Sequence, residues 1–314
     1  MRILDFLESI ENKTNRLVEE RGLAAIPHKE VVNKILQYCQ KFASSLKQGD
    51  NVTFVIPQQI VKSIDIIDNL EIEVTITDVT SDKSLNGSGR VELNDVVGWE
   101  DNKIDYAKIT IRAFSYNGVL YDRTILSSLY HELNHLYDFW NDISKSGSLY
   151  RVGKSLMKAG DRTRCEITFN QTTNDLIYEI VYRLFSETEL NALIANTYGD
   201  LQGMKSKREN FKDDIKKTKP YITYNGLKNR LSSIRNSILK VPNGISNLKK
   251  YLEENGIYLN PYDESDNAYL KEFFRKTTHL LKRLYKGIGK VASLYYDTNE
   301  FKYPSNNKIS TKWS

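Results

Sequence analysis

A change in the hydrophobic period, from two residues to about 3.6, most narrowly restricts the fold of this 314-residue chain. Apolar and polar residues alternate at 52–56, 72–79 and 106–114, which is the pattern of half-buried strands. Residues 123–141 then place an apolar stripe on one helical face, made of Ile125, Leu129, Leu133, Leu136 and Trp140. We therefore expect an α+β fold, with a mixed or antiparallel sheet in front of an amphipathic helix.

Helical periodicity also occurs on both sides of this central region. The other predicted helices are 3–20, 29–46, about 175–198, about 222–255 and about 264–296. Gly199 is a natural stop for the third of them, because glycine is common just past a helix end. Loops are predicted at residues 84–89 (SLNGSG) and 143–172.

Charge is unevenly divided along the chain. Residues 1–200 contain 22 Lys and Arg against 29 Asp and Glu, whereas residues 201–314 contain 23 against 11. With the periodicity, this predicts an N-terminal helical element (1–50), a core (51–200) and a basic, mostly helical C-terminal region (201–314). A basic region can bind nucleic acid, but acids interrupt the bases in KSKRENFKDDIKKTK, which favours a solvated helix.

The start of the chain and its cysteines are typical of a cytoplasmic protein. The first 22 residues mix acids with bases and lack the uninterrupted apolar stretch of a signal peptide or membrane span, so no membrane partner is expected. Cys39 and Cys165 form no CxxC pair. Neither a disulfide framework nor a thiolate zinc site is therefore predicted.

The helix predicted at 123–141 carries the motif HELNH. Residues i and i+4 lie on one helical face, so His131 and His135 can present two imidazole nitrogens to one Zn²⁺ ion. Glu132 is offset by one residue and can accept a proton from a zinc-bound water whose pKa is lowered toward ~7. Because the chain has only four histidines, a chance match is rare, and the motif favours a zinc site over two structural histidines.

A hydrolytic zinc site needs a third protein ligand and one position for water. No histidine follows His135 at the HExxHxxGxxH spacing, so we look for an acid on the next helix, where Glu187 and Glu189 are available. We favour Glu189, because Ser186 and Ala192 on either side leave room for close helix packing. Glu187 stays open as the alternative.

Other polar residues are candidates for supporting roles. Asp138 could accept the second imidazole N–H of a ligand, or could be a solvated helix acid. A donor to the oxyanion is also expected, and the sequence offers four candidates, Tyr178, Tyr182, Tyr198 and His279.

Through HELNHLYD and ETELNA, the chain resembles the zincin metallopeptidases, specifically the gluzincin-like group, and uncharacterised peptidases of bacteria and their phages. The resemblance covers about residues 105–200 and rests mainly on HExxH. It implies a zincin-like core, a Zn²⁺ cofactor and a protein or peptide substrate, hydrolysed through a zinc-bound water that Glu132 activates. Zincins commonly bind substrate along the edge strand ahead of the active helix, a position that we expect residues 106–114 to occupy.

Two other functions stay open. The first is a structural or cargo protein of a phage particle that retains a zincin-like fold. The high content of Asn, Lys, Ile and Tyr in the chain is typical of an AT-rich genome, which suits a phage protein. The second is nucleic-acid binding through residues 205–250, for which the sequence contains no recognised motif.

Overall fold

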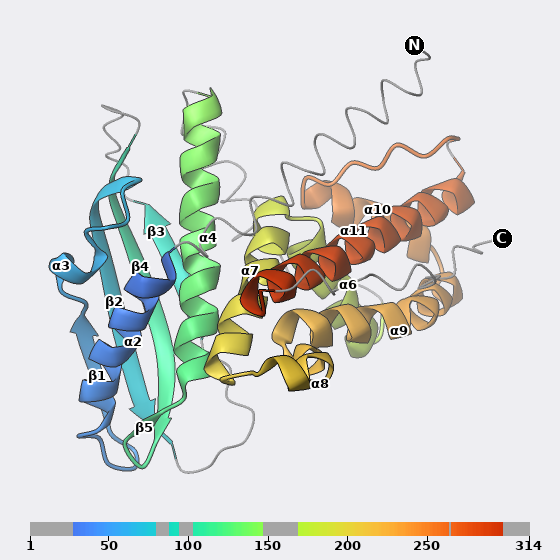
Figure 1. Cartoon of the computed structure of the whole chain (residues 1–314). Coiled ribbons are helices and arrows are strands. Elements are labelled where there is room, and N and C mark those ends of the chain that lie inside the picture. Colours follow the sequence, from blue (N-terminus) through green and yellow to red (C-terminus); the bar gives the residue numbers. More distant parts are fainter. Residues whose placement is uncertain (1–27, 80–87, 94–102, 147–168, 264, 298–314) are drawn as a thin grey trace.

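The computed structural model describes residues 28–79, 88–93, 103–146, 169–263 and 265–297. They form an α+β fold in which a mixed sheet and a group of helices meet at two helices, α4 and α7 (Figure 1). The α+β class and the mixed sheet are thus confirmed. The helix predicted at 3–20, most of the loop predicted at 143–172, and Cys165 lie outside the described residues.

Five strands form the described sheet, in the order β1-β2-β4-β3, with β5 paired to β4. The strands are β1 (Asn51–Val55), β2 (Ile67–Asp78), β3 (Ser88–Leu93), β4 (Ile104–Tyr116) and β5 (Val119–Leu120). Strands β2 and β4 are parallel, whereas the other three pairings are antiparallel. Every second residue of β2 from Leu70 to Asp78 is buried, as the alternation predicted.

Strand β4 lies inside the sheet between β2 and β3, so the prediction that residues 106–114 form the edge strand is wrong. The strand at that end of the sheet is β3, which begins within the loop predicted at 84–89. The sequence SGRVEL does not indicate a strand. Glycine is depleted in strands, and only Val91 and Leu93 supply apolar residues at alternate positions. Without β3, β4 was the last recognisable strand before the helix.

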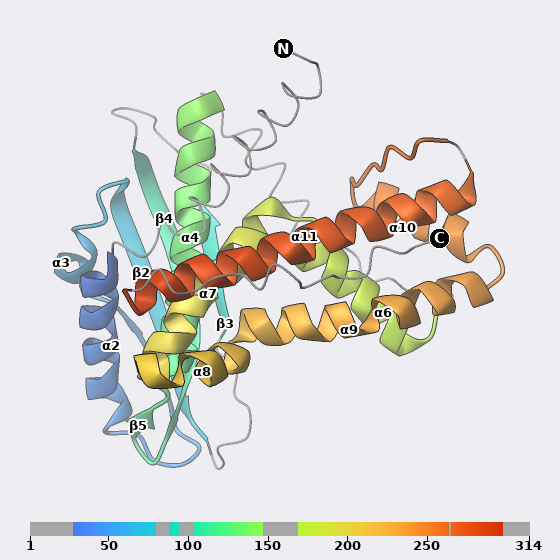
Figure 2. The ribbon, with the colours of Figure 1, turned by 45° about the vertical axis from the view of Figure 1, so that its right-hand side comes forward.

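Helices make up most of the remaining described chain (Figures 1 and 2). The α-helices are α2 (Lys29–Ala43), α3 (Gln58–Val61), α4 (Asp122–Ser146), α6 (Gln171–Glu179), α7 (Glu187–Gly203), α8 (Phe211–Lys217), α9 (Lys219–Lys240), α10 (Gly244–Glu254) and α11 (Asp266–Tyr295). A π-helical turn, η2 (Ile180–Leu184), follows α6, and a short 3₁₀ turn, η3 (Arg208–Asn210), precedes α8. Within the described ranges, none of these helices has both the length and the apolar character needed to span a membrane.

Helix α4 packs on the sheet through the predicted apolar stripe. The side chains of Ile125, Leu129, Leu133 and Leu136 are fully buried, and Trp140 is partly buried against the same cluster. Helix α2 contacts both α4 and the sheet, and His28, which precedes α2, shares a hydrogen bond with the Tyr137 hydroxyl group of α4.

The single helix predicted at 175–198 is two helices separated by η2, a bend at Phe185 and the extended residue Ser186. The Ser186 hydroxyl accepts a hydrogen bond from the backbone N–H of Glu189 and so caps α7. Gly199, the predicted stop, lies inside α7, where a Cβ would be 2.6 Å from the carbonyl oxygen of Leu126 in α4. Glycine is required there by close helix packing and does not end the helix.

The block predicted at 222–255 also divides, into α9 and α10. Pro242 has no backbone N–H, and Asn243 has a left-handed φ of 57°, so the helix ends there. Helix α11 is continuous and closely matches the prediction for 264–296.

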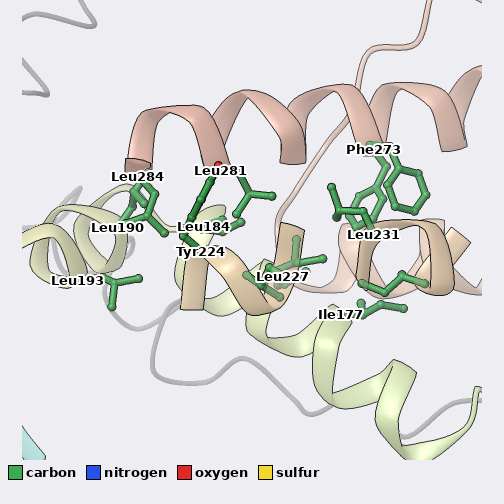
Figure 3. Packing of buried hydrophobic residues seen from close by; sticks show 14 of the residues in the cluster. Ile177, Leu184, Leu190, Leu193, Tyr224, Leu227, Leu231, Phe273, Leu281 and Leu284 are labelled. Carbon is green, nitrogen blue, oxygen red and sulfur yellow. The ribbon is translucent and has the colours of Figure 1, made fainter. Parts of the chain in front are cut away.

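Buried apolar side chains form two clusters in the described chain. One lies among the sheet, α2 and α4, and the other among η2, α7 and the C-terminal helices. Figure 3 shows part of the second cluster, with Leu190 and Leu193 of α7 near Leu284 of α11. Tyr198 of α7 packs against both clusters. The region boundaries at residues 50 and 200 stay a prediction.

Candidate metal centre

Two imidazoles from α4 and one carboxylate from α7 converge between these helices. The Nε2 atoms of His131 and His135 are 3.1 Å apart, and oxygens of Glu189 lie 3.7 Å and 3.5 Å from them, respectively. A tetrahedral ion with ligands at ~2.0–2.1 Å separates its ligand atoms by about 3.3 Å. The three donors are therefore spaced to hold a metal ion, and they form the only such group among the described residues.

Glu189 faces the two histidines, whereas Glu187 faces another helix. Glu189 is buried, but the side chain of Glu187 is 52% exposed and lies 3.8 Å from Nη2 of Arg283 in α11. Two residues advance a helix by about 200°, so two acids at this spacing point to nearly opposite sides. The geometry therefore favours Glu189 over Glu187 as the third ligand.

The start of α7 holds Glu189 in place. The carboxylate stands in the first turn of the helix, where the N-terminal dipole favours negative charge. The hydroxyl of Tyr182, in the π-helical turn η2, donates a hydrogen bond of 3.2 Å to Oε1 of Glu189. Single π turns are frequent at functional sites, since the extra residue redirects the following side chains.

Small residues allow α7 to approach α4 closely. A Cβ at Gly203 would lie 2.5 Å from Cα of Arg123, just as one at Gly199 would meet the backbone of Leu126. The guanidinium Nε of Arg123 also donates a 2.9 Å hydrogen bond to Asp200 Oδ1. The spacing of the two glycines, four residues apart, was the available sequence signal for this helix contact, and sequence reasoning missed it.

Glu132 follows His131 on α4 and is not one of the three donors. Its side chain is 4% exposed and packs against the backbone of β3 at Gly89. Its negative charge contributes to the raised pKa of His135. The absence of Glu132 from the donor group agrees with the one-residue offset, and its role as a general base stays a prediction.

The three ligand candidates differ in protonation, because the pKa of His135 is raised and those of His131 and Glu189 are lowered. Burial, with the nearby His135, lowers the pKa of His131 to about 3. Burial also disfavours charge on His135, but the hydrogen bond and charge of Glu189 outweigh burial and raise the pKa of His135 to about 9. Burial likewise opposes charge on Glu189, yet the hydrogen bond and charge of His135 lower its pKa to about 2. Without a metal, one imidazole therefore holds a proton beside an ionised carboxylate.

Asp138 supports the site by charge and not by the predicted hydrogen bond. Neither His131 Nδ1 nor His135 Nδ1 makes a hydrogen bond to a described residue, although both atoms are buried. Asp138 instead accepts a 3.3 Å hydrogen bond from Asn134 Nδ2, and it is 2% exposed. Both predictions for Asp138 are therefore wrong, since it is neither an imidazole acceptor nor solvated. Its charge contributes to the raised pKa of His135.

Of the four predicted oxyanion donors, Tyr182 is the one with a hydrogen bond to a ligand candidate in the described structure. Tyr178 stacks on Tyr182, with ring centroids 5.7 Å apart. Tyr198 packs against Tyr130 and Tyr295, with ring centroids 5.1 Å and 5.3 Å away. His279 is exposed on α11.

Comparison of the chain with protein-family models, with curated proteins and with solved structures finds no match. Two histidine nitrogens and one carboxylate oxygen, all within 4.8 Å of one another, define a candidate mononuclear metal centre.

Proposed function

We propose that the protein is a zinc-dependent metallopeptidase with a zincin-like core. The observation that carries this proposal is the spacing of 3.1 to 3.7 Å among the donor atoms of His131, His135 and Glu189. Two nitrogens and one oxygen are a ligand set of catalytic zinc sites, which keep a fourth position for water, whereas structural sites use four protein ligands. The described residues add no fourth protein ligand to this group.

The chain supplies a general base beside this centre. A zinc ion held there would lower the pKa of a water molecule toward ~7 and polarise a substrate carbonyl group. With zinc present, Glu132 would accept a proton from that water as the water oxygen attacks the carbonyl carbon, and would pass the proton to the departing amine nitrogen. Because Glu132 is buried, bulk water competes little for its carboxylate.

Tyr182 is the best-placed donor to the negative charge that develops on the carbonyl oxygen. Its hydroxyl donates a 3.2 Å hydrogen bond to the Glu189 carboxylate, and this one proton would turn to the carbonyl oxygen when substrate binds. Burial and the nearby Glu189 raise the pKa of Tyr182 above its usual value, so it stays protonated and able to donate.

The proposed substrate is an extended segment of a peptide or protein. Strand β3 ends the described sheet next to α4, and Gly89 in this strand touches Glu132. A peptide paired with the outer edge of β3 would run past Glu132 and the metal ligands. This assigns to β3 the role that the sequence suggested for residues 106–114.

A comparison of wild type with Glu132→Gln on a mixed peptide library tests the proposal. The substitution preserves shape and removes the base, so cleavage should fall about a hundredfold or more while zinc content is unchanged. Glu187→Gln, which alters an acid facing α11, is the matched control and should keep activity. A wild type that binds zinc but cleaves no peptide would instead favour a structural role.

A further inference from the structure

Strand β3 approaches the side chain of Glu132 at a single glycine. A Cβ at position 89 would lie 2.6 Å from both Cγ and Oε1 of Glu132 and 3.0 Å from Cδ. Non-bonded carbon atoms pack at about 3.5–4.0 Å, so any larger residue requires a displacement. Because Cγ is part of the contact, rotation of the carboxylate group alone does not relieve it.

The backbone conformation does not explain why this position is a glycine. Among the described glycines, those with positive φ are Gly49, Gly118 and Gly256, and Gly89 is not one of them. Gly89 pairs regularly with Ile111 of β4 in an antiparallel ladder. A glycine inside a strand is unfavourable, since it has no side chain to pack, and often marks a close approach to another group. Here that group is the side chain of Glu132.

Glu132 is enclosed between helix α4 and strand β3. Its backbone belongs to α4, which also carries His131 and His135, while its side chain is covered by β3 and is only 4% exposed. A side chain at position 89 would push the carboxylate away from β3 or push β3 away from α4. In either case the carboxylate would change its position relative to the histidines.

We propose that Gly89 is a positioning residue for Glu132, whose carboxylate β3 can hold beside the metal ligands only because position 89 has no Cβ. Its catalytic consequence rests on the proposed function, but the contact itself does not. Gly89→Ala is the direct test, and Gly226→Ala is a matched control, because a Cβ at Gly226 of α9 would meet nothing within 4 Å.

The first readout is kinetic. Gly89→Ala should keep its zinc and lower kcat about ten- to hundredfold, because misplacement of a reacting group by about 1 Å has effects of this size. KM should change little. In a Glu132→Asp background, whose side chain is one methylene shorter, Gly89→Ala should cause little further loss. The proposal is overturned if kcat of Gly89→Ala equals that of wild type. It is also overturned if Gly89→Ala lowers kcat by the same factor in the Glu132→Asp background as in wild type.

The second readout is a stability cycle that does not depend on activity. Gly89→Ala should lower the unfolding temperature of wild type but not that of Glu132→Ala, which lacks the atoms that clash. The double variant therefore also recovers folding if Gly89→Ala alone misfolds. Equal losses in both backgrounds would overturn the proposal. A wild type that cleaves nothing would refute the proposed function, and the cycle would still decide whether Gly89 positions Glu132.

Discussion

His135 Nε2 lies 3.5 Å from Oε1 of Glu189, and this pair joins α4 to α7 at the centre of the candidate site. Both side chains are nearly buried, at 9% and 11% exposure. Buried charges persist when they are paired or bind a metal, and here the proton on the histidine balances the carboxylate. The metal-free site thus holds a proton where a cation would bind, which connects metal affinity to pH.

Zinc binding at pH 6 is expected to release about one proton. The pKa of about 9 keeps His135 protonated in the metal-free protein, and a zinc ligand must be neutral imidazole. His131 and Glu189, with pKa values of about 3 and about 2, are already deprotonated. Affinity should therefore rise as pH increases and level off above about 9. Calorimetry in two buffers with different ionisation heats measures the proton count.

At pH 6, ionisation of the zinc-bound water contributes little to the measured proton release. At pH 6 a zinc-bound water with a pKa near ~7 is mostly un-ionised, so the released proton comes from the protein. Binding without proton release would show that both imidazoles are neutral in the metal-free protein and would contradict the charge distribution described above.

Glu189→Ala should remove tight zinc binding, whereas Glu187→Ala should not. Loss of even an outer partner of a ligand lowers metal affinity about 10–100-fold, so loss of the ligand itself should exceed about a hundredfold. Glu187 lies on another face of α7, where it pairs with Arg283 of α11. Removal of the Glu187 carboxylate should therefore leave zinc affinity nearly unchanged. Competition with a chromogenic chelator measures both. The wild type should bind about one zinc per chain, and equal losses in the two variants would exclude Glu189 as the third ligand.

Tyr182→Phe should lower kcat and leave zinc content unchanged. The substitution retains the ring that stacks on Tyr178 and removes the hydroxyl near Glu189. Removal of one oxyanion donor lowers kcat by about 10²–10³ in enzymes where this has been measured. Tyr178→Phe is the control and should have wild-type kinetics. If Tyr182→Phe lost zinc while kcat of the loaded enzyme stayed normal, the hydroxyl would serve only to orient Glu189.

Residues close together in the chain were the predictable part of this site. His131, Glu132 and His135 could be placed on one helix from their spacing, since the period of an α-helix determines which residues share a face. The third candidate ligand was harder to predict, because Glu187 and Glu189 stand in the same first helical turn. Their directions depend on where α7 begins, and the preceding π turn interrupts the regular period at that point.

Contacts between distant segments were the part that local patterns could not predict. Strand β3 has too few apolar residues for its alternation to stand out, so its edge position and its contact with Glu132 became visible only in the fold. Gly199 was read as a helix stop from the local preference of glycine. Its actual role depends on α4, which is more than 50 residues earlier in the chain.

Gly199→Ala should therefore destabilise the protein and weaken its metal site. A Cβ there would lie 2.6 Å from the carbonyl oxygen of Leu126 and 2.7 Å from the backbone nitrogen of Ser127. These are backbone atoms of α4 and cannot rotate away, so the two helices must separate. Overpacking of this kind costs about 1–3 kcal/mol, more than the ~1 kcal/mol that alanine gains over glycine inside a helix.

Separation of α4 from α7 also moves Glu189 away from His131 and His135, because these candidate ligands belong to the two helices. Zinc affinity of Gly199→Ala should thus fall together with the free energy of unfolding, as measured by chelator competition and urea denaturation. Gly226→Ala, in open space on α9, should gain up to ~1 kcal/mol and keep its affinity. If Gly199→Ala were as stable as wild type and bound zinc equally well, the close approach of α4 and α7 would not be what sets the ligand geometry.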